Sequence, residues 1–303
     1  TLHFFGLYSP QEIGVRMPRV AYDLIHPERR TTSVVFASPH SGRDYPWTFL
    51  RKTVLDQHTI RTSEDAFVDR LFAHAPKCGA PFLTAGAPRA FIDLNRAPEE
   101  LDPALFEGVS ARGHNPRVAS GLGVVPRVVA GGRAIYRGKL PLSEAERRIN
   151  TYWRPYHEML GKLLDQSKAA FGEAILVDCH SMPHEAMDLA ARGAIRRPEV
   201  VIGDRHGASA STEVVDHIEA AFTRAGLHVV RNVPFAGAYI CQTYGRPSKG
   251  QHAIQIEIDR SIYMNEQMIR PNGNFEAFRR VLKGITAEIC EIGRKVAEPL
   301  AAE

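Results

Sequence analysis

The segment that most constrains the fold is residues 254–259, in which isoleucine alternates strictly with polar residues, in the order Ile-Gln-Ile-Glu-Ile-Asp. A period of two residues is that of a β-strand whose two faces meet different surroundings. The isoleucines should face a core, and Gln255, Glu257 and Asp259 should share the opposite face. Two neighbouring acids on one face repel each other and give no stability. We therefore interpret this face as functional, with Glu257 as its first candidate.

Short apolar runs alternate along the chain with segments of helical spacing. The expected strands are 33–37, 81–84, 90–93, 174–178, 200–202, 227–230 and 252–258, and the expected helices are 65–75, 143–171, 211–225 and 275–296. This alternation predicts an α/β fold with a mostly parallel sheet. Sites in such sheets lie at the carboxyl ends of the strands, so polar residues just beyond a strand are the functional candidates.

We expect one domain over residues 1–303 with two irregular segments. Residues 1–30 are interrupted by prolines and are predicted to form an arm that wraps the domain. Residues 97–141 are rich in Gly, Pro and Arg, and an irregular stretch of that length usually forms a lid or a substrate-binding excursion. The helix that follows should begin at Ser143, which forms a capping box with Glu146.

Composition narrows the class of protein. Hydrophobic residues make up 44% of the chain, enough for a sizeable core. The net charge of +4 comes with scattered arginines, which suits a small anionic substrate and does not indicate nucleic-acid binding. The cysteines form no CxxC pair, no apolar run approaches the ~20 residues of a membrane helix, and the start lacks a signal peptide. We therefore expect a cytoplasmic protein without a membrane partner, and no feature indicates its oligomeric state.

Two histidines, His40 and His180, each follow a predicted buried strand and are the candidate metal ligands. Catalytic zinc commonly takes two histidines, one carboxylate and a water. For the carboxylate we prefer Asp65 over Glu64, and Asp44 stays open. The alternative for each histidine is that it caps a loop and binds no metal.

Two arginines near one expected strand could bind an anion. Arg89 precedes the run at 90–93, and Asn95 and Arg96 follow it. Guanidinium groups bind carboxylates through two parallel hydrogen bonds. The alternative is that both arginines are structural and paired with Asp93 or other acids.

Glu257 is the candidate general base, because a positioned carboxylate can take a proton from water and pass it to a leaving nitrogen. The alternative is a buried acid paired with Arg260. Asp178 could orient a histidine ligand by binding the ring nitrogen that does not bind the metal. For Asp204 and His206, in the loop after residues 200–202, substrate contact and bonds within the loop are equally open.

Five motifs keep a recognisable order along the chain. They are Ser38-Pro39-His40-Ser41-Gly42 with Tyr45-Pro46, Glu64-Asp65, Ile92-Asp93-Leu94-Asn95-Arg96, Asp178-Cys179-His180-Ser181-Met182, and residues 252–260 with Tyr263-Met264. Together these motifs resemble the N-formylglutamate amidohydrolase family, over about residues 33–285.

The resemblance implies a fold like that of the zinc carboxypeptidases and aspartoacylases, in which helices sandwich a mixed sheet. It also implies one zinc ion bound by His40, His180 and an acid. The position three residues after the first histidine, where carboxypeptidase-like sites carry a carboxylate, is Arg43 here. The acidic ligand must therefore come from elsewhere, and Asp65 is our assignment.

The resemblance also implies roles for the remaining candidates. Glu257 would activate water, and Arg89 would polarise the scissile carbonyl. Asn95 and Arg96 would hold the substrate carboxylate. Tyr244 is a weaker match to a tyrosine that contacts substrate.

The reaction implied is metal-dependent hydrolysis of an N-formyl or N-acyl acidic amino acid, a small anionic substrate. The first assignment is conversion of N-formyl-L-glutamate and water to formate and L-glutamate. Two alternatives stay open: a metal-independent amidase whose nucleophile is Cys179, and an inactive binding protein of the same fold. The absence of GxSxG, GxGxxG and Walker A motifs argues against a serine hydrolase of that type and against a nucleotide-binding enzyme.

Overall fold

The computed structural model describes residues 20–110, 115–188 and 196–294. Within these residues, one sheet has seven strands in the order β1-β3-β2-β4-β7-β5-β6. They are β1 (Tyr22–Ile25), β2 (Val34–Ser38), β3 (Phe82–Ala85), β4 (Ala174–Met182), β5 (Val200–Gly203), β6 (Val229–Arg231) and β7 (Gln251–Asp259), and a separate small sheet pairs β8 (Met264–Asn265) with β9 (Arg270–Pro271). In the large sheet only the pairs β1–β3 and β5–β7 are antiparallel. The predicted mixed, mostly parallel sheet is confirmed.

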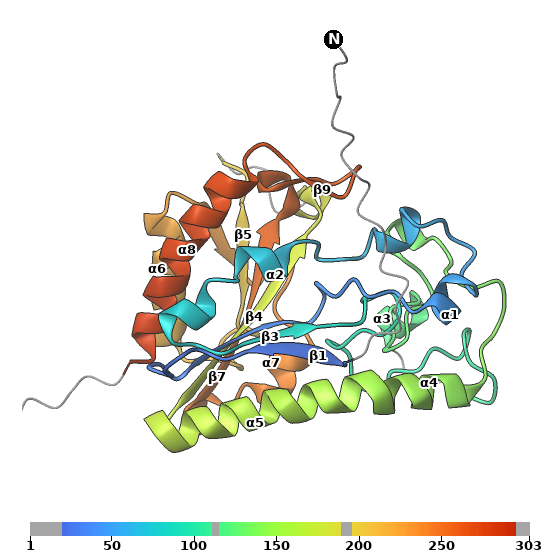
Figure 1. The fold of residues 1–303 in the computed structure, drawn as a ribbon, viewed down its shortest axis with the longest axis horizontal. Helices are drawn as coiled ribbons and strands as arrows, with labels where there is room; N and C mark the ends of the chain where they lie inside the picture. The colour runs from blue at the N-terminus through green and yellow to red at the C-terminus, as the bar shows by residue number, and fades with distance from the viewer. Residues whose placement is uncertain (1–19, 111–114, 189–195, 295–303) are drawn as a thin grey trace, which may run out of the picture.

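Helices cover both faces of this sheet (Figure 1). Those described are α1 (Trp47–Leu50), α2 (Val68–Leu71), α3 (Pro116–Ala119), α4 (Leu142–Arg148), α5 (Arg154–Phe171), α6 (Thr212–Arg224), α7 (Tyr239–Tyr244) and α8 (Phe275–Ile292). One core joins the buried residues of α6 and α8 to Ile175 and Val177 of β4, and a second joins those of α5 to Leu176. Because successive strand residues point to opposite faces, this division places α5 on one face and α6 with α8 on the other.

β4 and β7 are the central neighbours of the sheet, and they pair in parallel over their whole length. The isoleucines of residues 254–259 enter the core shared with α6 and α8, as their alternation predicts. Glu257 is therefore on the other face. Its Cα partner in β4 is His180, which the same alternation places beside it.

The predicted strand at 90–93 is wrong. The segment is irregular, because the backbone N–H groups of Phe91 and Asp93 donate to Pro88 and Val124 rather than to a neighbouring strand. Phe91 and Ile92 nevertheless belong to the core under α5. An apolar run therefore marks burial here without marking a strand.

Two helix starts also differ from the prediction. Within the segment 65–75, the only α-helix is α2, because Phe67 has a φ of 68° and an α-helix cannot begin before Val68. The capping box is absent, since α4 begins at Leu142 and places Ser143 inside the helix. From there α4, a π-helical turn (Ile149–Trp153) and α5 run on without a break to Phe171, as predicted.

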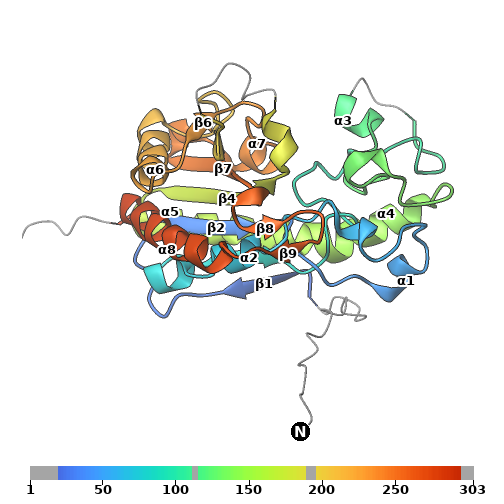
Figure 2. The ribbon, with the colours of Figure 1, turned by 90° about the horizontal axis from the view of Figure 1, so that it is seen from above.

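The two irregular segments are described in part. Residues 1–19 of the expected arm lie outside the described residues, and residues 22–25 form the edge strand β1. The excursion 97–141, apart from 111–114, contains α3 and little other regular structure. Figure 2 shows α3 at the side of the molecule away from α6 and α8. Among the described helices, none is both long and apolar enough to cross a membrane.

Candidate active site

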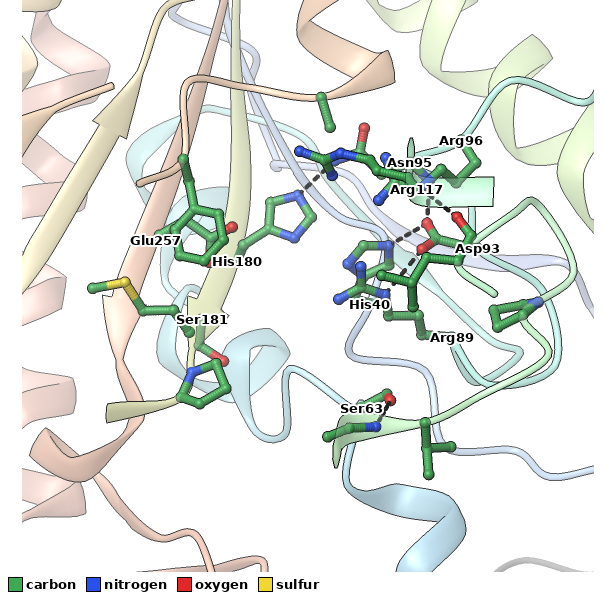
Figure 3. A pocket seen from close by; sticks show the side chains of 18 of the residues that line it. His40, Ser63, Arg89, Asp93, Asn95, Arg96, Arg117, His180, Ser181 and Glu257 are labelled. Carbon is green, nitrogen blue, oxygen red and sulfur yellow. Dashed lines mark hydrogen bonds and ion pairs between the residues drawn. The ribbon is translucent and has the colours of Figure 1, made fainter. Parts of the chain in front are cut away.

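Polar residues at the ends of three neighbouring parallel strands line one cavity. His40 follows β2, His180 lies near the end of β4, and Glu257 lies near the end of β7. All three line a cavity of about 440 Å³ that also borders the excursion (Figure 3). The site is thus at the carboxyl edge of the sheet, where parallel strands direct their loops to one place.

Asp65 lies between the two histidines. One of its carboxylate oxygens, Oδ2, is 2.9 Å from Nδ1 of His180 and 3.5 Å from Nδ1 of His40. The backbone N–H of Asp65 donates to the carbonyl of His40 at 3.0 Å, which ties the two loops together. The three residues are almost fully buried, and their ligand atoms lie within 4.8 Å of one another. They form a group that could hold one metal ion.

Aspartates hold Nε2 of both histidines, and Nδ1 of both rings faces the carboxylate of Asp65. Nε2 of His40 lies 2.7 Å from Asp93, and Nε2 of His180 lies 2.9 Å from Asp178. Carboxylates that hold the outer nitrogen of a histidine ligand are usual in metal sites.

The surroundings of the other ring nitrogen of His40, Nδ1, indicate whether a metal ion fits the site. Nδ1 of His40 is buried and has no hydrogen-bond partner among the described residues. A buried polar atom without a partner is rare in a folded protein. Two imidazole nitrogens and one carboxylate oxygen are a donor set that suits zinc. The residues present therefore fit a divalent cation.

The other two candidate acids lie elsewhere. Glu64 accepts hydrogen bonds from the Tyr45 hydroxyl at 2.7 Å and from Arg61 at 3.0 Å. Asp44 is exposed, and burial of part of its carboxyl together with the nearby Asp23 raises its pKa. Of the three acids considered, only Asp65 joins the histidines.

Glu257 is held in place from within its own strand. The side-chain amide of Gln255 donates to Glu257 Oε1 at 2.8 Å, and the Gln255 oxygen accepts from the backbone N–H of Ala238 at 3.1 Å. Burial raises the pKa of Glu257 to about 7. Arg260 pairs with Asp65 at 3.0 Å, so the ion pair between Glu257 and Arg260 that we considered is not formed.

The arginines predicted around residues 90–93 both line the cavity, but they are fixed differently. Nε of Arg89 donates to Asp93 at 3.0 Å, so Asp93 is its ion-pair partner. Nε of Arg96 donates to the carbonyl of Leu122 at 3.0 Å. Asn95 also lines the cavity, and its amide nitrogen lies 3.1 Å from Nε2 of His180.

Arg117 is a cavity residue that the sequence pattern did not reveal. It lies on α3, within the excursion, and Figure 3 shows it beside Arg96. The only signal for it was the general expectation that the excursion binds substrate.

Three other sequence candidates are placed outside the cavity lining. The hydroxyl of Tyr244 pairs with His157 Nδ1 at 3.0 Å, behind the loop of Asn95. Asp204 accepts from Asn232 at 2.7 Å, and Asn232 in turn accepts from the backbone N–H of His206 at 3.3 Å. Asp204 and His206 are thus bonded to Asn232, which follows β6, rather than only within their own loop.

Cys179 lies in the core shared with α6 and α8, on the face of β4 opposite to His180. Burial, with the charge of Asp178, raises the pKa of its thiol well above the usual range. A nucleophilic cysteine needs an accessible thiolate. The position of Cys179 therefore argues against the cysteine amidase alternative.

Comparison with known proteins identifies the family of this chain. The family model described as N-formylglutamate amidohydrolase matches residues 32–264. The chain is 32% identical to the N-formylglutamate deformylase of Pseudomonas aeruginosa, covering 79% of this chain and 85% of the relative. It is 28% identical to that of Pseudomonas putida, covering 77% and 82%. The crystal structure of N-formylglutamate amidohydrolase from Ralstonia eutropha superposes with a TM-score of 0.84 at 33% identity, covering 90% of this chain and 98% of that one. This chain belongs to the N-formylglutamate amidohydrolase family.

Proposed function

We propose that this protein hydrolyses the amide of an N-formyl acidic amino acid, N-formyl-L-glutamate first, to formate and the free amino acid. We further propose that it uses one zinc ion bound by His40, Asp65 and His180. The observation that carries the proposal is the buried Nδ1 of His40, which forms no hydrogen bond with the described residues and lies 3.5 Å from Asp65 Oδ2, in the cavity that Glu257 lines. The names of the relatives support the choice of substrate.

A divalent cation at this position would supply positive charge that polarises the scissile carbonyl and makes water more acidic. The chain's own part begins with the two buried aspartates, Asp93 and Asp178, which fix the rings of the histidines. Asp65 is fixed from its other oxygen, because Oδ1 accepts from Arg260 at 3.0 Å. The ligand atoms are therefore held in place by the protein, which favours binding of an ion.

Glu257 would move the proton. In this role its carboxylate takes a proton from the attacking water and gives it to the amide nitrogen as the carbon–nitrogen bond breaks. A group whose pKa lies near neutrality suits both transfers, and burial gives Glu257 a pKa of about 7. Gln255 would keep the carboxylate in place during the transfers, because its amide is itself fixed by Ala238.

Two arginines would act on opposite ends of the substrate. Arg89, held by Asp93, would donate to the carbonyl oxygen as negative charge develops there, in the manner of an oxyanion hole. Arg96 would bind the α-carboxylate. A cavity of about 440 Å³ is of the size that small-molecule sites commonly have.

The experiment measures metal content and activity together. The purified protein is assayed for formate release from N-formyl-L-glutamate before chelation, after chelation, and after zinc is restored. We expect about one metal ion per chain and activity that disappears and returns with zinc. His40→Ala should lose both metal and activity. Full activity in chelated protein would refute the metal-dependent function, and metal binding without turnover of any N-formyl amino acid would favour an inactive binding protein.

A further inference from the structure

Two of the arginines that line the cavity have no acidic partner among the described residues. Four arginines line it, namely Arg89, Arg96, Arg117 and Arg260. Arg89 lies 3.0 Å from an oxygen of Asp93, and Arg260 lies at the same distance from Asp65. Among the residues that the structure describes, no carboxylate lies within 4 Å of the other two guanidinium groups. Two positive charges therefore face the cavity without acidic partners.

The backbone of one residue, Leu122, connects these two arginines. The carbonyl of Leu122 accepts from Nε of Arg96 at 3.0 Å, and its N–H donates to the carbonyl of Arg117 at 2.8 Å. The carbonyl of Arg96 also accepts from Nε1 of Trp153 at 2.9 Å. Arg96 is thus held at its backbone and at its guanidinium, and Arg117 is positioned relative to it.

The turn that carries Arg117 is also anchored. The side chain of Asn115 accepts from the backbone N–H of Arg117 at 3.0 Å and from that of Val118 at 3.3 Å. Ser120 donates to the carbonyl of Pro116 at 2.8 Å. The side chain of Arg117 is nevertheless exposed at the mouth of the cavity, so its guanidinium stays available to a ligand.

We propose that Arg117 is the specificity-determining residue for acidic substrates and binds the side-chain carboxylate while Arg96 binds the α-carboxylate. This inference rests on the proposed function. An N-formyl acidic amino acid carries two carboxylates, and the cavity presents two unpaired guanidinium groups. An uncharged side chain such as that of glutamine leaves the charge of Arg117 without a partner. Charge-assisted hydrogen bonds are about twice as strong as neutral ones, so the acidic substrate is favoured.

The test compares N-formyl-L-glutamate with N-formyl-L-glutamine, which differ by one charge and almost nothing in size. The zinc-loaded wild type and Arg117→Gln are assayed on both substrates, with Arg117→Lys as the variant that keeps the charge. Arg133→Gln is the matched control, because Arg133 lies on the same excursion, is exposed, and does not line the cavity.

We expect Arg117→Gln to lower kcat/KM for the glutamate substrate about tenfold, mainly through KM, and to leave the glutamine substrate unchanged. Arg117→Lys should retain part of the preference, and Arg133→Gln should behave as the wild type. The loss should shrink with added salt, because Arg117 is exposed and its attraction is screened. A variant that merely disturbs the loop would slow both substrates equally.

The outcomes separate this inference from the proposed function. If the wild type prefers the glutamate substrate and Arg117→Gln keeps that preference in full, the inference is wrong and the deformylase function stands. The inference is also wrong if the wild type hydrolyses both substrates equally well. If the wild type hydrolyses neither substrate with zinc bound, both the proposed function and the inference fall.

Discussion

Replacing Asp93 with asparagine would test how the site holds the proposed metal ion, because it removes one charge and keeps the shape. Oδ1 of Asp93 accepts from Nε2 of His40 at 2.7 Å and from the backbone N–H of Asn95 at 2.8 Å, and Oδ2 accepts from Arg89 at 3.0 Å. Burial opposes the charge of Asp93, but His40 and Arg89 hold its pKa well below the usual range. Asparagine offers one acceptor oxygen, so its amide nitrogen must face one of these donors.

The magnitude follows from these contacts. Changing a residue that orients a histidine ligand commonly weakens metal binding ~10–100-fold. We expect the zinc affinity of Asp93→Asn to fall by a factor in the upper part of that range. One side-chain oxygen of asparagine must replace the two oxygens of Asp93 that accept from His40, Asn95 and Arg89. We also expect kcat to stay low when zinc is saturating, since Arg89 loses the carboxylate that holds it at the attacked carbonyl.

Asp178→Asn is the matched control. Asp178 holds Nε2 of His180 at 2.9 Å but forms no ion pair with an arginine among the described residues. It should weaken zinc binding to a similar extent, and excess zinc should restore its kcat. Zinc affinity is measured by competition with a chromophoric chelator, and kcat is measured against zinc concentration. Wild-type zinc affinity in Asp93→Asn would refute the orienting role, and full recovery of its kcat with zinc would refute the coupling to Arg89.

Three further predictions concern single residues. Glu257→Gln should bind zinc but turn over ~10²–10⁴-fold more slowly, and a loss of zinc instead would make Glu257 a ligand. Arg96→Ala should mainly raise KM, whereas Arg89→Ala should lower kcat by about 10²–10³, and steady-state kinetics on N-formyl-L-glutamate separate these effects. Burial lowers the pKa of His157 to about 4 from 6.5, so the unfolded chain binds a proton that the folded protein rejects, and stability should fall as pH drops from 6.5 to 4. The free energy of unfolding of His157→Gln, measured with denaturant, should lack this part of the pH dependence, which is at most about 3 kcal/mol. If its slope against pH equals that of the wild type, His157 does not cause this dependence.

The parts of the fold that could be predicted are those that one strand's own pattern determines. Alternation in residues 254–259 correctly placed the isoleucines in a core and Glu257 in the cavity, because the pleat of a strand alone sets which side chains share a face. The expectation that polar residues just beyond a strand line the site holds for His40, which follows β2. His180 lines the cavity too, but it lies within β4, which is longer than the predicted strand 174–178. The parallel pairing of β2, β4 and β7 then brings these three residues together.

The failures involve contacts between distant segments. Phe91 and Ile92 resemble a strand in composition, but no neighbouring strand is available to them, and only the folded chain shows that Val124 takes the hydrogen bond of Asp93. Arg117 is exposed on a helix of one turn, without hydrophobic periodicity. Its place in the site depends on hydrogen bonds through Leu122, which no local pattern records.

The charged residues of the site have two roles. At the proposed metal site, Asp65 joins the two histidines through one carboxylate oxygen, and Arg260 donates to its other oxygen. The loop of residues 94–96 is held from the helical layer, because Trp153 and His157 donate to the carbonyls of residues 96 and 94 at 2.9 Å and 2.8 Å. The Tyr244 hydroxyl is bonded to the ring of His157 and lies outside the cavity lining. Arg96 and Arg117 have no carboxylate within ion-pair distance among the described residues. On the proposal made above, a substrate with two carboxylates would supply these partners, so the same contacts would give recognition and charge balance.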